Sequence, residues 1–176
     1  MDSFEEALAL DVRKKIYNEI EKAPGLHFRE IQRRAGLATG AMQYHLEYLT
    51  KRHIIKIEKD GKFVRYFAVR GPQLGEDTKL MSLLRKETVR KILIFLLTKK
   101  RANNLTISRK LALSPSSVSW QVEKLLAQGV LEKKSRGRKI YYKIINPEKV
   151  SQLLIAHRKS FLDELVDNFA EIWTQM

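Results

Sequence analysis

The sequence predicts a mainly α protein with small β-hairpins, an α+β fold of two tandem copies of one unit followed by a long C-terminal helix. The first observation behind this prediction is an internal repeat: residues 37–69 align without a gap on residues 113–145, which lie 76 positions later. The second is that each copy passes from a helical apolar rhythm to two β-forming runs around a glycine. The matched positions include Met42 and Val118, Tyr44 and Trp120, Leu46 and Val122, Glu47 and Glu123, Leu49 and Leu125, and Gly61 and Gly137.

The first copy contains three predicted helices and a hairpin. Apolar residues at helical spacing predict a helix over residues 11–22, which Pro24-Gly25 closes, and a short helix is also expected over residues 4–10. Gly36 supplies the left-handed residue that ends the second helix. The predicted elements are helices 11–22, 28–35 and 38–51, a strand at 54–59, a turn at Asp60-Gly61 and a return strand at 62–69.

The second copy repeats this order after a linker predicted at residues 71–75. Ser114 followed by Pro115 predicts the start of its third helix, because serine caps a helix and proline fits the first helical position. The hairpin tip is expected at Arg136-Gly137-Arg138. The predicted helices are 87–98, 105–111 and 115–128.

The C-terminal stretch, residues 147–176, predicts one long helix, because apolar residues recur in threes and fours with no glycine or proline after Pro147. Two interpretations stay open. The helix covers the core of the second copy, or it pairs with its twin across a two-fold axis through a coiled-coil-like stripe. The stripe is Leu162, Leu165, Phe169, Ile172 and Met176. The domains expected are residues 1–75, 76–146 and 147–176.

Charge is unevenly distributed along the 176 residues, whose net charge is +14. Residues 1–75 carry +4, residues 76–146 carry +12 and residues 147–176 carry −2. A basic centre with a mildly acidic tail indicates a polyanion partner, of which nucleic acid is the commonest. The absence of cysteine excludes disulfides and cysteine metal sites. An acidic N-terminus and the lack of a long apolar run favour a cytoplasmic protein.

Three helices followed by a hairpin make a winged helix-turn-helix. The stretch GLATGAMQYHLEYLTKRHIIKIEKDGKFVRYF resembles the archaeal winged-helix transcriptional regulators related to the ArsR group. The resemblance covers both copies, roughly residues 11–70 and 87–145. It implies that the third helix enters the major groove, that the basic wing meets the flanking backbone or minor groove, and that terminal helices form a homodimer.

The third helix of the first copy carries the predicted base-reading residues. Because Met42, Leu46 and Leu49 must face the core, the opposite face of the helix turns outward. Glutamine can pair with adenine through two hydrogen bonds, and threonine or alanine can contact a thymine methyl group. The DNA-contact candidates on this helix are Thr39, Ala41, Gln43 and Tyr44.

The second copy and the two hairpins supply candidates suited to phosphates. Small hydroxyls are weak readers of bases, so we expect the second copy to contribute backbone affinity while the first discriminates bases. The candidates on its third helix are Ser116, Ser117, Ser119, Trp120 and Lys124. Those on the wings are Lys59, Lys62 and Arg65, and Arg136, Arg138 and Lys139. The alternatives are a solvated helix face, packing of the two aromatic residues on the wings, and lysines that guard strand edges.

These observations predict a sequence-specific, double-stranded DNA-binding transcriptional regulator, with recognition helices 38–51 and 115–128 in the major groove. Its expected partners are DNA, a second copy of the chain and basal transcription factors. The alternative is a tandem winged-helix architectural or protein-interaction module of chromosome or transcription machinery. RNA binding is a weaker option. The chain has no Gly-rich phosphate loop or nucleophile motif, so no enzyme activity, cofactor or metal is predicted.

Overall fold

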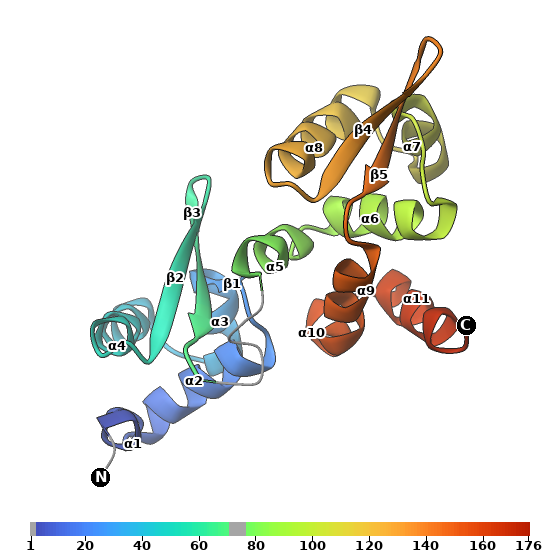
Figure 1. The fold of residues 1–176 in the computed structure, drawn as a ribbon. Coiled ribbons are helices and arrows are strands. Elements are labelled where there is room, and N and C mark those ends of the chain that lie inside the picture. Colours follow the sequence, from blue (N-terminus) through green and yellow to red (C-terminus); the bar gives the residue numbers. More distant parts are fainter. Residues whose placement is uncertain (1–2, 71–76) are drawn as a thin grey trace. The chain divides into compact units, whose positions relative to one another are not determined.

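The computed structural model describes residues 3–70 and 77–176, so the linker predicted at residues 71–75 lies outside the described part of the chain (Figure 1). The chain forms two compact units, here called unit 1 (Met1–Ser82) and unit 2 (Leu83–Met176). The short helix α5 (Thr78–Leu84) contains the boundary between them. No helix in the described part is long and apolar enough to cross a membrane.

Unit 1 packs its helices against a three-stranded antiparallel sheet with the order β1-β3-β2 (Figure 1). The two-residue strand β1 was not predicted, because it is too short to leave a periodic pattern. The core residues Ile16, Ile31 and Leu49 are fully buried. The elements are α1 (Ser3–Ala7), α2 (Asp11–Lys22), β1 (Leu26–His27), α3 (Phe28–Ala35), α4 (Thr39–Lys51), β2 (Ile55–Asp60) and β3 (Phe63–Ala68).

Capping residues explain where α3 begins and ends. The His27 side chain accepts a hydrogen bond from the Glu30 amide, and the Glu30 carboxylate accepts one from the His27 amide, which makes a capping box. At the other end Gly36 adopts a left-handed φ of 69°. The predicted bounds of α2 and α3 are confirmed: Gly36 marked the end of α3 in the sequence, and the capping box at its start is added by the structure.

Unit 2 repeats the three helices and the hairpin. Asn103 caps α7 and Ser114 caps α8, where Pro115 takes the first helical position as predicted. The place of β1 is taken by an isolated antiparallel bridge between Ala102 and Tyr142. The elements are α6 (Glu87–Lys99), α7 (Asn104–Leu111), α8 (Pro115–Ala127), β4 (Leu131–Arg136) and β5 (Lys139–Ile144).

The repeat extends to the limits of the elements. Helices α3 and α4 and strands β2 and β3 match α7, α8, β4 and β5 with the same offset of 76 residues at both ends. The core positions Met42 and Val118 are both fully buried. The internal repeat predicted from the sequence is confirmed.

The turn of the β2–β3 hairpin lies one residue later in the sequence than predicted. Asp60 still pairs with Phe63 in the β2–β3 ladder, so the turn residues are Gly61 and Lys62 rather than Asp60 and Gly61. Gly61 takes a left-handed φ of 62°, as does Gly137 in unit 2. The glycine was identified correctly, but the strand pairing decided its place in the turn.

The C-terminal residues form three helices, so the prediction of one long helix over 147–176 is wrong. Leu162 adopts a left-handed φ of 52°, and Asp163 then caps a new helix by accepting a hydrogen bond from the Leu165 amide. Within unit 2, α11 packs on α9 and α6, which buries Val166 and Phe169. The three helices are α9 (Pro147–Ala156), α10 (Arg158–Phe161) and α11 (Glu164–Thr174).

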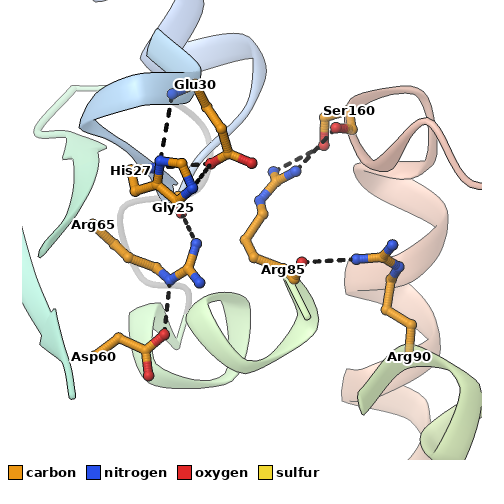
Figure 2. Close-up of polar contacts among 8 residues, drawn as sticks. All are labelled: Gly25, His27, Glu30, Asp60, Arg65, Arg85, Arg90 and Ser160. Atoms are coloured by element: carbon orange, nitrogen blue, oxygen red, sulfur yellow. Dashed lines mark hydrogen bonds and ion pairs between the residues drawn. The ribbon is translucent and has the colours of Figure 1, made fainter. Parts of the chain in front are cut away.

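The break occurs because a buried arginine binds the chain between α10 and α11. The Arg90 guanidinium on α6 lies 2.7 Å from the Asp163 carboxylate and also donates to the Leu84 carbonyl oxygen. Arg85 donates to the backbone and the hydroxyl of Ser160 in the same region (Figure 2). These contacts favour a chain reversal at a place where the sequence has no glycine or proline. The reversal was not predicted, because the residues that make the contacts are 73 and 75 positions apart in the sequence.

Candidate nucleic-acid interface

Helix α4 presents one polar face to solvent because its apolar residues are committed to the core. Met42, Leu46 and Leu49 are almost fully buried. On the opposite face Tyr44 is 61% exposed and makes an edge contact with the His45 ring at 5.2 Å. The predicted outward positions are confirmed as exposed for all four candidates, Thr39, Ala41, Gln43 and Tyr44.

Hydrogen bonds preorganise two of these side chains. The Gln32 amide nitrogen donates to the Thr39 hydroxyl at 3.0 Å, which fixes the first turn of α4 to α3. One turn later the Gln43 amide nitrogen donates to the Glu47 carboxylate at 3.2 Å. The exposed face of α4 therefore carries an oriented amide, the group type that recognises adenine.

A groove of about 500 Å³ lies beside this face, between α4 and the sheet of unit 1. Phe28, Ile57 and Tyr66 supply apolar surface, while Gln43 and Glu47 lie on the α4 side. Burial, and to a lesser extent the Glu47 carboxylate, raises the pKa of the Tyr66 hydroxyl above its usual value. The tyrosine therefore stays neutral at physiological pH.

Helix α8 exposes hydroxyls and an aromatic residue at the matching positions. Trp120 is 56% exposed, and the Lys124 ammonium lies 3.9 Å from the centroid of its ring, a cation–π contact. The Ser119 hydroxyl accepts a hydrogen bond from the Asn104 amide at 2.8 Å. Ser116 and Ser117 are exposed in the first turn of α8, where the Ser117 amide donates to the Ser114 hydroxyl.

In unit 2 an ion pair joins the helix and the strand at the positions that match the groove of unit 1. Lys133 on β4 forms an ion pair with Glu123 on α8 at 3.4 Å. The matching residues in unit 1 are Ile57 and Glu47, between which no ion pair can form. The repeated glutamate thus has a cationic partner in unit 2 and faces an apolar side chain in unit 1.

The tips of the two hairpins differ in charge. Arg136, Arg138 and Lys139 are all exposed at the tip of β4–β5. On β2–β3 both Lys59 and Lys62 are exposed, and the Lys62 ammonium lies 5.4 Å from the centroid of the Phe63 ring. Five of the six predicted wing cations therefore reach solvent.

The sixth, Arg65, is buried, so its prediction as an outward wing residue is wrong. Only 5% of Arg65 is exposed. Its guanidinium binds the Asp60 carboxylate at 3.0 Å and the Gly25 carbonyl oxygen at 3.0 Å (Figure 2). Alternation along β3 could have found this placement, because Arg65 shares a strand face with the buried Phe67.

Two exposed acidic residues were not named as site residues. Glu47 and Glu123 are the acidic residues of α4 and α8, and both are exposed on the same helix face as the candidates. The repeat matched them in the sequence, but an acidic side chain was not counted as a candidate for contact with a polyanion. Among the described residues no group of three histidine or acidic side chains lies close enough to hold a metal ion.

Comparisons with known proteins divide the chain in the same way. Residues 10–75 match a family model described as an N-terminal HTH domain, and residues 85–132 match one described as winged helix-turn-helix DNA-binding. The chain is also 31% identical over 142 residues to an uncharacterised HTH-type transcriptional regulator of Methanocaldococcus jannaschii. The match covers 80% of this chain and 35% of that relative, so the chain spans about a third of the relative's length.

Proposed function

We propose that this chain, a tandem winged helix-turn-helix protein similar to an archaeal HTH-type regulator, is a sequence-specific DNA-binding transcription regulator. In the proposed complex α4 and α8 enter the major groove of double-stranded DNA, and the hairpins meet the flanking backbone. Occupying a promoter in this way would block polymerase or recruit basal transcription factors.

The observation that carries the proposal is the same exposed surface in both copies. Tyr44 and Trp120 stand at matching positions and are 61% and 56% exposed. Large aromatic side chains left in solvent do not stabilise a fold, and their repetition favours a binding surface. Each unit also carries exposed cations on its hairpin, which fits a polyanion.

A division of work between the two units follows from their side chains. In unit 1 Gln43 is exposed and oriented for adenine, and Thr39 and Ala41 can contact thymine methyl groups. In unit 2 the matching helix offers serine hydroxyls, which suit phosphates or bridging water. Unit 1 would therefore choose the sequence, and unit 2, with Arg136, Arg138 and Lys139, would add affinity for any DNA.

The experiment is selection of bound sequences from random double-stranded DNA, followed by binding of two variants to the selected and to a random duplex. Gln43→Ala should lower affinity for the selected duplex while leaving the random duplex almost unchanged. Arg138→Ala should weaken binding to both and reduce the salt slope by about one. Equal losses on both duplexes from both variants would contradict the base-reading role of Gln43.

We also propose that the protein forms a homodimer through its C-terminal helices. The support is a set of large apolar side chains that unit 2 leaves in solvent: Leu162 is 85% exposed, Ile172 64% and Met176 94%. Truncation at Pro147 is not a clean test, because it removes the buried residues Val150 and Phe169. Ile172→Lys is cleaner. It should halve the sedimenting mass and leave the helix content unchanged, and an unchanged mass would contradict the dimer.

A further inference from the structure

We propose that Glu47 is a second base-reading residue on α4, which accepts a hydrogen bond from the exocyclic amine of a cytosine next to the base pair contacted by Gln43. This inference rests on the DNA-binding function proposed above. It names part of the sequence that unit 1 would select. Cytosine and adenine both present an exocyclic amine in the major groove, but adenine also presents the N7 acceptor, which repels a carboxylate, so the carboxylate matches cytosine.

The hydrogen bond between Gln43 and Glu47 leaves other polar atoms of both side chains available for contacts with bases. One N–H of the Gln43 amide is donated to Glu47 Oε1 at 3.2 Å. The other N–H and the Gln43 Oε1 have no partner among the described residues, so both stay available for the N7 and N6 groups of adenine. The second carboxylate oxygen of Glu47 is likewise without a partner in the described part of the chain. It can accept from a cytosine amine.

The two polar groups lie side by side on one helix face, as two neighbouring base pairs require. The hydrogen bond of 3.2 Å from the Gln43 amide nitrogen to Glu47 Oε1 holds the amide and the carboxylate together. Successive base pairs in B-DNA are separated by about 3.4 Å. Helical side chains also lean toward the N-terminus, so the Glu47 carboxylate lies closer to the leading turn of α4 than its backbone does. Two adjacent bases can therefore be read at once.

Charge argues that Glu47 is more than a solvated residue. In a chain of net charge +14, an exposed carboxylate on the DNA-facing helix repels phosphates and weakens binding to every sequence. No lysine or arginine in the described residues pairs with it. The repulsion is offset only on a sequence that presents a hydrogen-bond donor, which makes Glu47 a source of discrimination in both directions.

The second copy provides a natural control. Glu123 occupies the matching position on α8, but Lys133 neutralises it at 3.4 Å. Gln43 is replaced there by Ser119, whose hydroxyl already accepts a hydrogen bond from Asn104. Unit 2 therefore has a glutamate whose charge is balanced by a lysine and which has no amide beside it, and Glu123 is not expected to read a base.

The test is sequence selection with the full chain from random double-stranded DNA, using the wild type, Glu47→Gln and Glu123→Gln. Both glutamates are exposed, so neither change should impair folding. The wild type should select a cytosine directly beside an adenine, with roughly a ten-fold preference at that cytosine. Glu47→Gln should lose the cytosine, keep the adenine and bind random DNA at least as tightly as the wild type. Glu123→Gln should select the wild-type motif.

Two results would overturn the inference. One is a motif in which Glu47→Gln leaves the cytosine preference intact, and the other is a wild-type motif without cytosine beside the adenine. In both cases the protein would still be a sequence-specific DNA-binding protein. A wild type that binds DNA but selects no motif would instead overturn the proposed function together with the inference.

Discussion

The hairpin of unit 1 carries Asp60, Lys62 and Phe63 at its tip, whereas the matching positions of unit 2 are Arg136, Arg138 and Lys139. The same backbone thus holds a nearly neutral tip in one copy and three cations in the other. A repeated fold fixes where a tip stands but not what the tip does. Under the proposed function, one scaffold serves two kinds of contact.

The two units also bury their arginines differently. In unit 1 Arg65 ties the hairpin to the loop before β1 through Asp60 and Gly25. In unit 2 Arg90 ties the C-terminal helices to α6 through Asp163. The positions are not equivalent in the repeat. Each unit therefore has its own internal tether, which can be broken separately.

The largest expected effect concerns the charged hairpin of unit 2. Replacing Arg136, Arg138 and Lys139 together by glutamine should reduce the salt slope of DNA binding by about 2.7, since each phosphate contact contributes about 0.9. At 0.1 M salt this corresponds to a loss of roughly several-hundred-fold in affinity for every sequence. Binding measured against salt concentration tests the expectation. Lys62→Gln in unit 1 is the matched control and should change the slope by about 0.9 at most.

Breaking the tether of unit 2 should give the next largest effect. The Arg90 and Asp163 side chains are only 7% and 12% exposed. Asp163→Asn keeps the cap on α11 but leaves the buried guanidinium without a counter-charge. The free energy of unfolding should therefore fall by about 3 kcal/mol. Both tryptophans, Trp120 and Trp173, lie in unit 2, so their fluorescence in a urea titration reports this unit. A change below about 1 kcal/mol would contradict the tether.

Unit 2 should also lose stability in mild acid because of His157, which is 4% exposed. Burial, with Arg85 as a second cause, lowers the pKa of the His157 imidazole to about 4. The unfolded chain then binds a proton near its usual pKa while the folded unit does not, so stability is full above pH 7 and falls as the pH drops. The expected loss between pH 7.5 and pH 5 is about 2 kcal/mol.

Tryptophan fluorescence during urea unfolding at the two pH values measures this loss. His157→Leu removes the titrating group, and its stability should therefore vary less with pH over this range. His53 is exposed, so His53→Gln should keep the pH dependence of the wild type. A variant without His157 that loses as much stability as the wild type would show that another group is responsible.

The smallest expected effect uses the left-handed residues that end the second helix of each copy. Gly36 has a φ of 69° in unit 1, and its counterpart Ala112 has a φ of 52° in unit 2. Ala112→Gly should stabilise unit 2 by about 0.5 kcal/mol, because it relieves left-handed strain at some cost in unfolded-chain entropy. The reverse change, Gly36→Ala, should cost about 1 kcal/mol. A steric clash does not contribute to this cost, because a Cβ at Gly36 would meet no atom within 4 Å. Thermal unfolding of the two variants and the wild type measures both changes in stability.

The sequence by itself determined the elements whose signals are local. The end of α3 follows from Gly36, and the outward position of Gln43 follows from the apolar spacing of its neighbours. The repeat added a second, independent indication for each of these elements. Period, caps and turn glycines depend on residues within one or two turns, so the sequence shows them directly.

Tertiary structure decided where charge is buried and what each repeated glutamate meets. Arg65 turned inward because Gly25 and Asp60 receive its guanidinium, and the C-terminal stretch broke at Leu162 because Arg90 binds Asp163. The helix-to-strand neighbour of Glu47 is an isoleucine, while that of Glu123 is a lysine. Gly25 lies 40 residues from Arg65, and Asp163 lies 73 residues from Arg90, so only the folded chain brings these partners together. An ionic side chain can be buried only where such a partner compensates its lost hydration.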